Sequence, residues 1–332
     1  MSVLRVALDL DGSLEALTNS MSELATALAE RPDLELLPFR SRSSSSDGAV
    51  PLRGRWLWAP LWHRGMGPSV QRQLAGADVV HVAGLVTPPT GDVPLIISVD
   101  DLRPFREDAR SRFRGHQLQR CAARGARIVT SSRTAAHEVQ EVLGLDRAQV
   151  SVVRPPVAAL TPTNDGGSLV VYVVGQIERF FSLAPLFGDF ANDVGADLLV
   201  IGSSALAARL RISGLRATFV HRSNASEAIA QARVVALMSD GARFPAFAIA
   251  ALGAGVPTVA RGSEINRELL GGAAAIVDED EEFLPQLTAL WYDDSRRAIA
   301  RAAGRARAQD FSPRTVASVY ATLYADVAKG FR

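Results

Sequence analysis

The sequence has very few cysteines and lysines for its 332 residues. The one cysteine, Cys121, excludes a disulfide framework and a zinc site built from several thiolates. The one lysine, Lys329, lies three residues from the end, so any mechanism that needs a lysine in the body of the fold is excluded. Arginine supplies the other 35 of the 36 basic residues, a bias that fits GC-rich coding better than a function.

A surplus of charge of one sign is also absent. The 36 basic and 35 acidic residues leave a net charge of +1, which argues against a dedicated nucleic-acid-binding protein. With 48% hydrophobic and 21% charged residues, the composition is that of an ordinary globular protein. The length predicts about two domains with a sizeable core.

Long hydrophobic runs are missing as well. The N-terminus lacks the apolar segment and the cleavage site of a signal peptide. The longest uncharged stretch, between Arg243 and Arg261, contains two prolines and two glycines and is too irregular to cross a membrane. We therefore expect a cytoplasmic protein, with peripheral contact to a membrane left open.

What the chain does contain is an alternation of apolar strand-like runs and amphipathic helical patterns. Helical periodicity covers residues 14–28, 111–124 and 134–143, whereas the segment from Arg40 to about Pro68 is predicted to be a loop. The alternation indicates a parallel sheet covered by helices on both faces. Strands are predicted in the first half at Val3–Leu10, Leu34–Pro38, Val79–Ala83, Pro94–Val99, Arg127–Thr130 and Val150–Val153.

The pattern stops at a segment rich in Pro, Thr, Asn and Gly and then begins again. We predict an N-terminal domain over residues 1–157, a linker over 158–167, a second domain over 168–310 and a final helix over 311–332. The fold class is then α/β, with two doubly wound, Rossmann-like domains that face a ligand-binding cleft. Strands are predicted in the second half at Leu169–Val174, Asp197–Ile201, Ala217–Val220, Val234–Met238, Pro257–Ala260 and Ala274–Val277.

One motif at the end of the first strand points to a different chemistry. Asp9 and Asp11 in the segment Leu8–Leu14 resemble the first motif of haloacid-dehalogenase-type phosphatases, in which one aspartate attacks phosphorus and the next is the acid/base. That family also needs a lysine, and the only lysine here is Lys329. The phosphatase is therefore a remote alternative, and a strand end followed by a turn at Gly12 is the simpler interpretation.

A series of short segments from Asp78 onward carries a second resemblance. They are Asp78–His81 followed by Pro88-Pro89, Pro94–Leu102, Ala126–Val139, Val150–Pro156, Val173–Gly175, Ala232–Pro257, Gly271–Asp278 and Phe311-Ser312. In order and spacing they resemble family four of the GT-B glycosyltransferases, which move a sugar from a nucleotide donor with retention. The resemblance covers about three quarters of the chain. It implies the GT-B fold, with a C-terminal helix that crosses back to the first domain, a nucleotide-sugar donor, no metal and no other cofactor.

The sequence departs from the family where the family's chemistry lies. Phe180 and Phe181 stand where the family has an Arg-Lys pair for the diphosphate. Ala242 and Ala250 stand where it has two glutamates eight residues apart, and Asp100 replaces the histidine of its T-V-H-D-L strand. Core and turn positions are kept, whereas polar positions that face the cleft in the family are not.

The resemblance still implies candidate site residues, which fall into three groups. Asp100 and Asp101 are the catalytic candidates that would contact the sugars. Arg179, Arg243 and Arg267 are the candidates to hold the diphosphate, since transfer must stabilise a departing anion. The donor-binding candidates are Gly175, Gln176, Arg179, Ser239, Arg243, Phe244, Arg267 and Glu268. The acceptor-side candidates are Asp11, Gly12, Trp56, Trp58, Trp62 and His81.

Two interpretations of the function remain open. The first is a glycosyltransferase that binds a nucleotide-sugar and a glycan or glycoconjugate acceptor, in which other groups replace the missing side chains. The second is a catalytically inactive homologue that acts as a scaffold, with a catalytic paralogue or a second copy of itself as the partner. Three of the four tryptophans lie among arginines between Arg53 and Arg72, which suits an acceptor sugar, a lipid surface or a protein partner, although aromatic packing is the simpler explanation.

Overall fold

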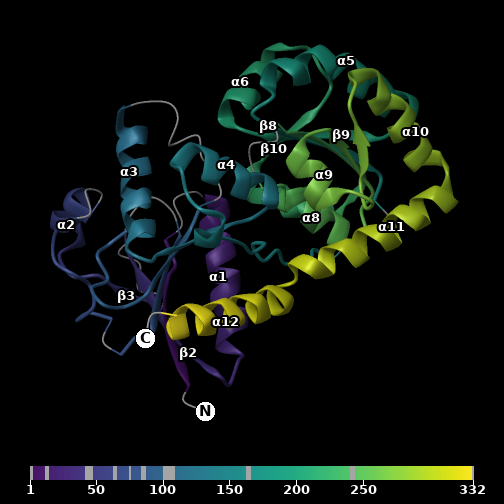
Figure 1. Ribbon diagram of the computed structural model, residues 1–332. Helices are drawn as coiled ribbons and strands as arrows, with labels where there is room; N and C mark the ends of the chain where they lie inside the picture. Colours follow the sequence, from purple (N-terminus) through teal and green to yellow (C-terminus); the bar gives the residue numbers. More distant parts are fainter. Residues whose placement is uncertain are drawn as a thin grey trace. The chain divides into compact units, whose positions relative to one another are not determined.

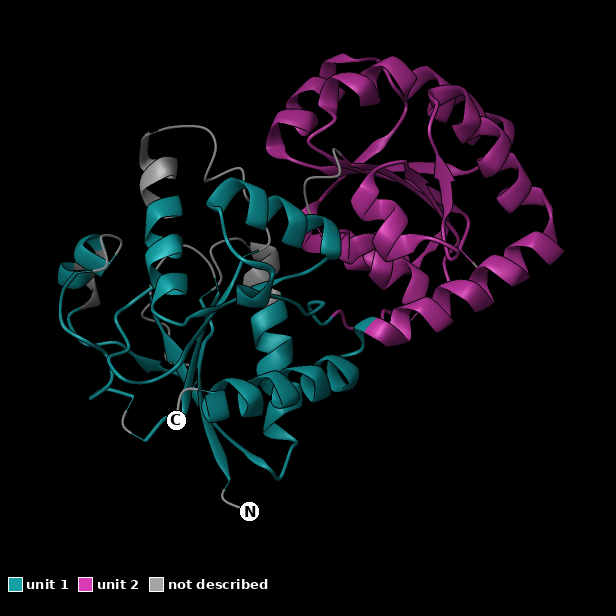
Figure 2. Ribbon diagram, in the orientation of Figure 1, with its two compact units in different colours: residues 1–156, 311–332 teal, residues 157–310 magenta. Residues whose placement is uncertain are grey.

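The computed structural model describes residues 3–11, 15–41, 48–62, 66–74, 76–83, 87–99, 109–161, 166–239 and 244–330. The chain folds as two units (Figure 2). The N-terminal unit comprises residues 1–156 and 311–332, and the C-terminal unit comprises residues 157–310. Each unit contains its own parallel sheet with helices on both faces (Figure 1).

The sheet of the N-terminal unit has the strand order β3-β2-β1-β4-β5-β6-β7, and every described strand pair in it is parallel. The chain order reverses between β1 and β4, so this sheet has a switch point at its centre. The strands are β1 (Leu4–Asp9), β2 (Leu34–Arg40), β3 (Val50–Pro51), β4 (Val79–Ala83), β5 (Leu95–Ser98), β6 (Arg127–Thr130) and β7 (Val150–Val152).

Alternate strand residues bury themselves on opposite faces of this sheet. Ala7 belongs to a core cluster that includes side chains of α2, α3 and α4, whereas Val6 and Leu8 belong to a second cluster with α1 and α12. The last helix of the chain is therefore part of the first unit, and α12 packs along α1 and β4 (Figure 1). The helices are α1 (Glu15–Ala29), α2 (Arg55–Trp62), α3 (Ala109–Ala123), α4 (Arg133–Leu143) and α12 (Pro313–Gly330).

The sheet of the C-terminal unit has the strand order β10-β9-β8-β11-β12-β13. In chain order this is 3-2-1-4-5-6, the order of dinucleotide-binding domains, with the switch point between β8 and β11. The strands are β8 (Ser168–Val174), β9 (Asp197–Gly202), β10 (Thr218–His221), β11 (Ala232–Ser239), β12 (Thr258–Arg261) and β13 (Ala275–Val277).

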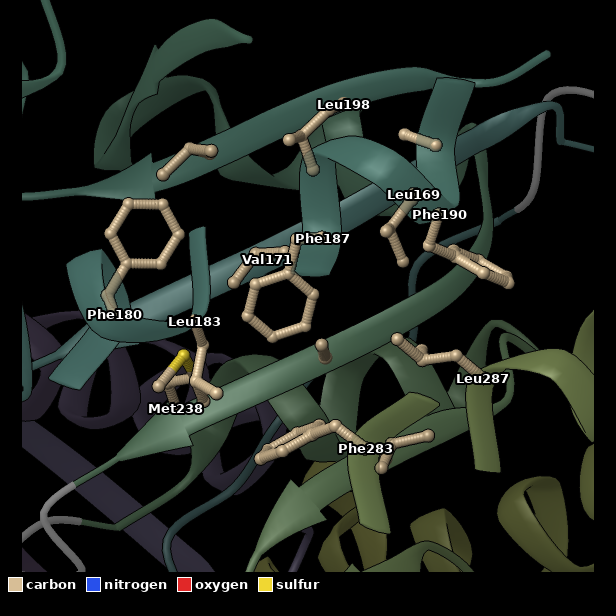
Figure 3. Close-up of a cluster of buried hydrophobic side chains, with 14 of the residues drawn as sticks. Leu169, Val171, Phe180, Leu183, Phe187, Phe190, Leu198, Met238, Phe283 and Leu287 are labelled. Carbon is tan, nitrogen blue, oxygen red and sulfur yellow. The ribbon is translucent and has the colours of Figure 1, made fainter. Parts of the chain in front are cut away.

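The main core of the C-terminal unit is rich in phenylalanine. Phe180, Phe187 and Phe190 on α5 pack with Phe283 on α10 against β8, β9 and β11 (Figure 3). The other face of the sheet is covered by α8, which α11 in turn covers. The helices are α5 (Ile177–Asp193), α6 (Ser204–Ile212), α7 (Ala225–Ala230), α8 (Ala246–Gly253), α9 (Glu264–Leu270), α10 (Phe283–Tyr292) and α11 (Asp294–Ala308).

The predicted fold class is confirmed, and the twelve predicted strands are all present. The segment predicted as a loop after Arg40 also contains β3 and the helix α2. Short elements of this kind leave little periodicity in the sequence: β3 has two residues, and α2 contains Pro60 in its interior.

Candidate functional site

A pocket of about 500 Å³ lies at the carboxyl end of β8, beside the switch point of the C-terminal sheet. Open parallel sheets bind ligands at such points because the first helix after the strand points its N-terminus there. The wall of the pocket is formed by the β8–α5 turn, the first turn of α5 and one residue that follows β13. The lining residues are Gly175, Gln176, Ile177, Glu178, Arg179 and Asp280.

The tight turn from β8 into α5 depends on Gly175. Its φ of 72° is a conformation that residues with a Cβ atom rarely adopt. Gln176 is the N-cap of α5, and its side chain makes no capping hydrogen bond. The glutamine side chain therefore leaves the amide groups of the first helical turn uncovered, and such amides are donors suited to an anionic group.

Asp280 brings two arginines together at the edge of this pocket. Arg179 Nε donates to both carboxylate oxygens of Asp280, at 2.9 and 3.1 Å. Arg261, at the end of β12, places Nη1 3.8 Å from Asp280 Oδ1. That Arg261 nitrogen is enclosed and has no hydrogen-bond partner among the described residues. Arg179 and Asp280 thus line the pocket as an ion pair, and Arg261 approaches that pair from the end of β12.

Arg267 and Glu268 are the other charged donor-site candidates that the structure describes. Arg267 on α9 pairs with Asp278, which lies two residues before Asp280. The backbone oxygen of Glu268 accepts a hydrogen bond from Arg307. Arg267 and Glu268 do not line the pocket, so the structure joins Arg267 to the site only through the acidic segment after β13.

Phe180 and Phe181, the residues that the sequence resemblance aligns with an Arg-Lys pair, do not line the pocket. Phe180 is fully buried in the core of the C-terminal unit (Figure 3). Phe181 packs beside it, with the guanidinium carbon of Arg209 4.4 Å from its ring centroid. The two phenylalanines therefore contribute to packing and leave the β8–α5 turn open.

Ser239 and Phe244 flank the switch point from the other side. Ser239 is the last residue of β11 and pairs in register with Val174, directly before Gly175. Phe244 precedes Pro245, the N-cap of α8. Ala250, which the sequence resemblance aligns with a glutamate, is buried in α8, a helix that carries no charged side chain.

In the N-terminal unit, Asp11 belongs to a buried polar cluster at the ends of β1 and β2. Asp11 Oδ1 accepts from Arg40 Nη1 at 2.8 Å, and both side chains are buried. Asp9 accepts from the amide groups of Asp11 and Ser41 and from the Ser41 hydroxyl, at 3.0, 3.2 and 2.5 Å. Burial raises the pKa of Asp9 to about 7, against the lowering effect of these hydrogen bonds.

This cluster bears on the phosphatase alternative. A nucleophilic aspartate must reach its substrate, but Asp9 is only 1% exposed and its oxygens accept three hydrogen bonds. Asp11, the second aspartate of the motif, is paired with Arg40. The two carboxylates thus connect β1 to the segment that follows β2.

His81 is a core residue of the N-terminal unit. Its Nδ1 lies 2.8 Å from the Tyr324 hydroxyl and its Nε2 lies 2.9 Å from Ser98 Oγ, with all three side chains buried. Burial lowers the pKa of His81 to about 3, so the ring is neutral and links α12 to β4 and β5. With both nitrogens engaged, His81 does not present a group to an acceptor in this structure.

The tryptophan segment folds as α2. Trp62 is fully buried and donates from Nε1 to the oxygen of Pro68 at 3.2 Å, and Trp58 packs half-buried against the same core. Trp62 is therefore a packing residue, which agrees with aromatic packing as the simpler explanation of the tryptophan cluster. Leu57 and Met66 are half exposed at and beside this helix.

Several candidates lie outside the described residues, namely Gly12, Asp100, Asp101 and Arg243. For Trp56 the structure describes the backbone within α2. Arg261 and Asp280 were not among the sequence candidates. Each follows or ends a strand of the C-terminal sheet, and strand-end position is the signal that could have found them.

Metal and membrane features are absent from the part of the chain that the structure describes. No group of three or more His, Cys, Asp or Glu side chains there could hold a metal ion. No described helix is both long and apolar enough to span a membrane.

Comparison with known proteins defines the class. WaaG, a glycosyltransferase involved in lipopolysaccharide biosynthesis, superposes with a TM-score of 0.70 at 14% identity, over 96% of this chain and 99% of WaaG. Anabaena HepE in complex with UDP and glucose superposes with a TM-score of 0.68 at 16% identity, over 97% of this chain and 99% of HepE. Sucrose-phosphate synthase of Thermosynechococcus elongatus superposes with a TM-score of 0.66 at 14% identity, over 98% of this chain and 100% of the synthase. The chain therefore has the GT-B fold of the glycosyltransferases.

A comparison of the sequence with protein-family models gives a more specific match for the N-terminal unit. Residues 17–159 match the family model described as Glycosyltransferase Family 4. The predicted resemblance to family four is thus confirmed, and the match lies almost wholly in the N-terminal unit. No curated protein sequence matches the chain.

Proposed function

We propose that this protein transfers a sugar from a nucleotide-sugar to a glycan or glycoconjugate acceptor, and that the pocket at the end of β8 holds the donor diphosphate. The observation that carries the proposal is the position of Arg179 and the N-terminus of α5 in the lining of that pocket, with Arg261 3.8 Å from the pocket residue Asp280. Guanidinium groups and helix amides are the groups that stabilise a departing diphosphate. The UDP and glucose bound by HepE, a protein of the same fold, support this class of donor.

The proposed mechanism needs no metal and no cofactor. Arg179 replaces the family's Arg-Lys pair from one position earlier in the sequence, and Arg261 adds a second cation from β12. Retention of configuration and contacts of Asp100 or Asp101 with the sugars follow from the family resemblance. Leaving-group stabilisation by fixed cations is worth several kcal/mol when water is excluded.

Isothermal titration with UDP, GDP and their sugars tests the proposal. We expect one nucleotide to bind, and we expect Arg179→Ala to weaken its binding about tenfold or more, because a charge-assisted hydrogen bond to phosphate is lost. Arg211→Ala removes a cation from the end of α6 and is the control. Absence of nucleotide binding together with absence of donor hydrolysis would reject the proposal.

A second candidate is a homologue without catalysis that acts with a catalytic paralogue or as a homodimer. The apolar α8 favours it, because Ala250 leaves no carboxylate at the position where the family binds ribose. Nucleotide binding without hydrolysis or transfer to any acceptor, combined with co-purification of a transferase, would support this candidate over the first.

We further propose a cytoplasmic protein with peripheral membrane contact through α2. Leu57 and Met66 are exposed there, and residues 48–77 contain four arginines and no acidic residue. Exposed apolar side chains in a segment rich in arginine suit anionic lipid headgroups. Sedimentation with vesicles of anionic lipid tests this, and recovery of all the protein in the supernatant would contradict it.

A further inference from the structure

The acidic segment Asp278–Glu282 has the form of a solvated helix start in the sequence, but the structure gives its side chains specific partners. Asp280 pairs with Arg179 and approaches Arg261, and Asp278 pairs with Arg267. Glu282 accepts the backbone amides of Asp278 and Glu279, at 2.7 and 3.2 Å, which holds the segment in a tight turn. Two acidic side chains from one short segment therefore engage three arginines.

The position of the Asp278 carboxylate also depends on a glycine, because a side chain at that position would occupy the same space. A Cβ atom at Gly262, between Arg261 and α9, would collide with the Asp278 carboxylate. Glu178, which lines the pocket, pairs with Arg209. Each of the four arginines named here thus faces a carboxylate, and the described part of this edge carries little net charge.

The Arg261 guanidinium remains incompletely satisfied in this arrangement. Its Nη1 is enclosed, and at 3.8 Å from Asp280 Oδ1 it is too far for a hydrogen bond. A buried charged donor without an acceptor is costly, and an oxygen closer than that of Asp280 would relieve the cost. An anionic oxygen that took the place of the Asp280 carboxylate and came within hydrogen-bond distance of Arg261 Nη1 would therefore be favoured.

We propose that Asp280 is a built-in competitor of the ligand. Its carboxylate occupies, against Arg179 and Arg261, the place that a phosphate group of a nucleoside diphosphate takes, and the ligand must displace it to bind. This inference rests on the proposed function, because it assumes that the pocket receives a diphosphate. Asp280 then sets the affinity of the pocket for anions and keeps the two arginines oriented while the pocket is empty.

The test compares Asp280→Asn with the wild type in titrations with UDP, GDP and inorganic pyrophosphate. The amide keeps the shape of the side chain and removes its charge. We expect about fivefold tighter binding of the nucleotide that the wild type prefers, since a partly exposed ion pair is a modest competitor. We expect no such gain in affinity when the double variant Asp280→Asn/Arg179→Ala is compared with Arg179→Ala alone.

The matched control is Asp294→Asn, which removes one negative charge and one ion pair from the same unit, at Arg297 on α11. This control should leave nucleotide affinity unchanged, so a general charge effect would appear in both variants. A purely structural Asp280 would lower the melting temperature of Asp280→Asn without tightening binding.

The outcomes separate the two proposals. Tighter binding by Asp280→Asn, or binding by that variant alone, supports the competitor. Equal or weaker binding by Asp280→Asn, with clear binding by the wild type, contradicts the proposal that Asp280 competes with the ligand. The proposed function then remains in place. Absence of binding to every protein and every ligand rejects the proposed function, and the competitor with it.

Discussion

Asp9 is a carboxylic acid that the fold encloses almost completely. Burial is the main cause of its raised pKa, with the Asp11 charge acting in the same direction and the Ser41 hydroxyl and two backbone amides opposing it. The value of about 7 lies above the ordinary value of 3.8. The folded protein therefore favours the protonated acid more than the unfolded chain does.

This shift predicts a loss of stability as the pH rises. Because the folded pKa lies above the unfolded one, the contribution of Asp9 is fully present below about pH 4 and is lost as the pH rises to about 7. Three pKa units correspond to about 4 kcal/mol. Asp9→Asn imitates the protonated acid, so the wild type should lose about 4 kcal/mol relative to the variant between these pH values.

Urea unfolding of both proteins at several pH values from 4 to 8 measures this difference. Other titrating groups, His81 included, are common to both proteins and cancel in the comparison. A difference in unfolding free energy that does not change with pH would show that the Asp9 carboxyl titrates in the folded protein as it does in the unfolded chain.

At the scale of the element, α12 is attached to the N-terminal sheet by a polar contact inside an apolar interface. Val316, Tyr320 and Tyr324 pack into the core, and Tyr324 meets His81. The lowered pKa of His81 means that this contribution to stability is present above about pH 6.5 and is lost as the pH falls toward 3. Acid should therefore weaken the attachment of α12 to β4.

Replacement of Tyr324 by Phe tests this attachment. The change removes the hydroxyl and leaves the enclosed Nδ1 of His81 without that partner, which should cost about 1–3 kcal/mol of unfolding free energy. Hydrogen exchange should show faster opening of residues 313–330, with little change in α5. The control Tyr292→Phe alters an exposed tyrosine of α10 and should change stability very little. Equal effects of the two changes would contradict the assigned role of Tyr324.

At the scale of the whole molecule, the two units differ in how the chain builds them. The C-terminal unit is one continuous segment, 157–310, whereas the N-terminal unit needs two separate segments. Both the Phe-rich core and every residue that lines the pocket belong to the continuous segment. The buried face of α12 belongs to the core of the other unit.

We therefore expect residues 157–310, expressed alone, to fold cooperatively and to bind the same nucleotide as the full chain. Residues 1–156 alone lack α12 and should remain aggregated or only partly folded, because they expose the apolar side chains that α12 covers. Circular dichroism, thermal unfolding and titration of both fragments measure this. Cooperative unfolding of 1–156 alone would contradict the importance of α12.

Much of the fold could be predicted because strand and helix periodicity depends on near neighbours in the sequence. β3 and α2 escaped prediction because two residues, or a short helix with an internal proline, carry almost no periodic signal. Of the donor-site candidates, Gly175, Gln176 and Arg179 do line one pocket. These three residues lie within one strand–turn–helix segment, which is why local sequence was sufficient to group them.

The sequence by itself determined the order of most strands and helices and the absence of a lysine from the body of the fold. Only the tertiary structure decided which charges meet. Arg179 and Asp280 are 101 residues apart in the chain, and His81 and Tyr324 are 243 apart. Parallel strands are joined by crossovers, so residues from distant segments gather at the ends of neighbouring strands. Burial and ion pairing arise only when that assembly is complete.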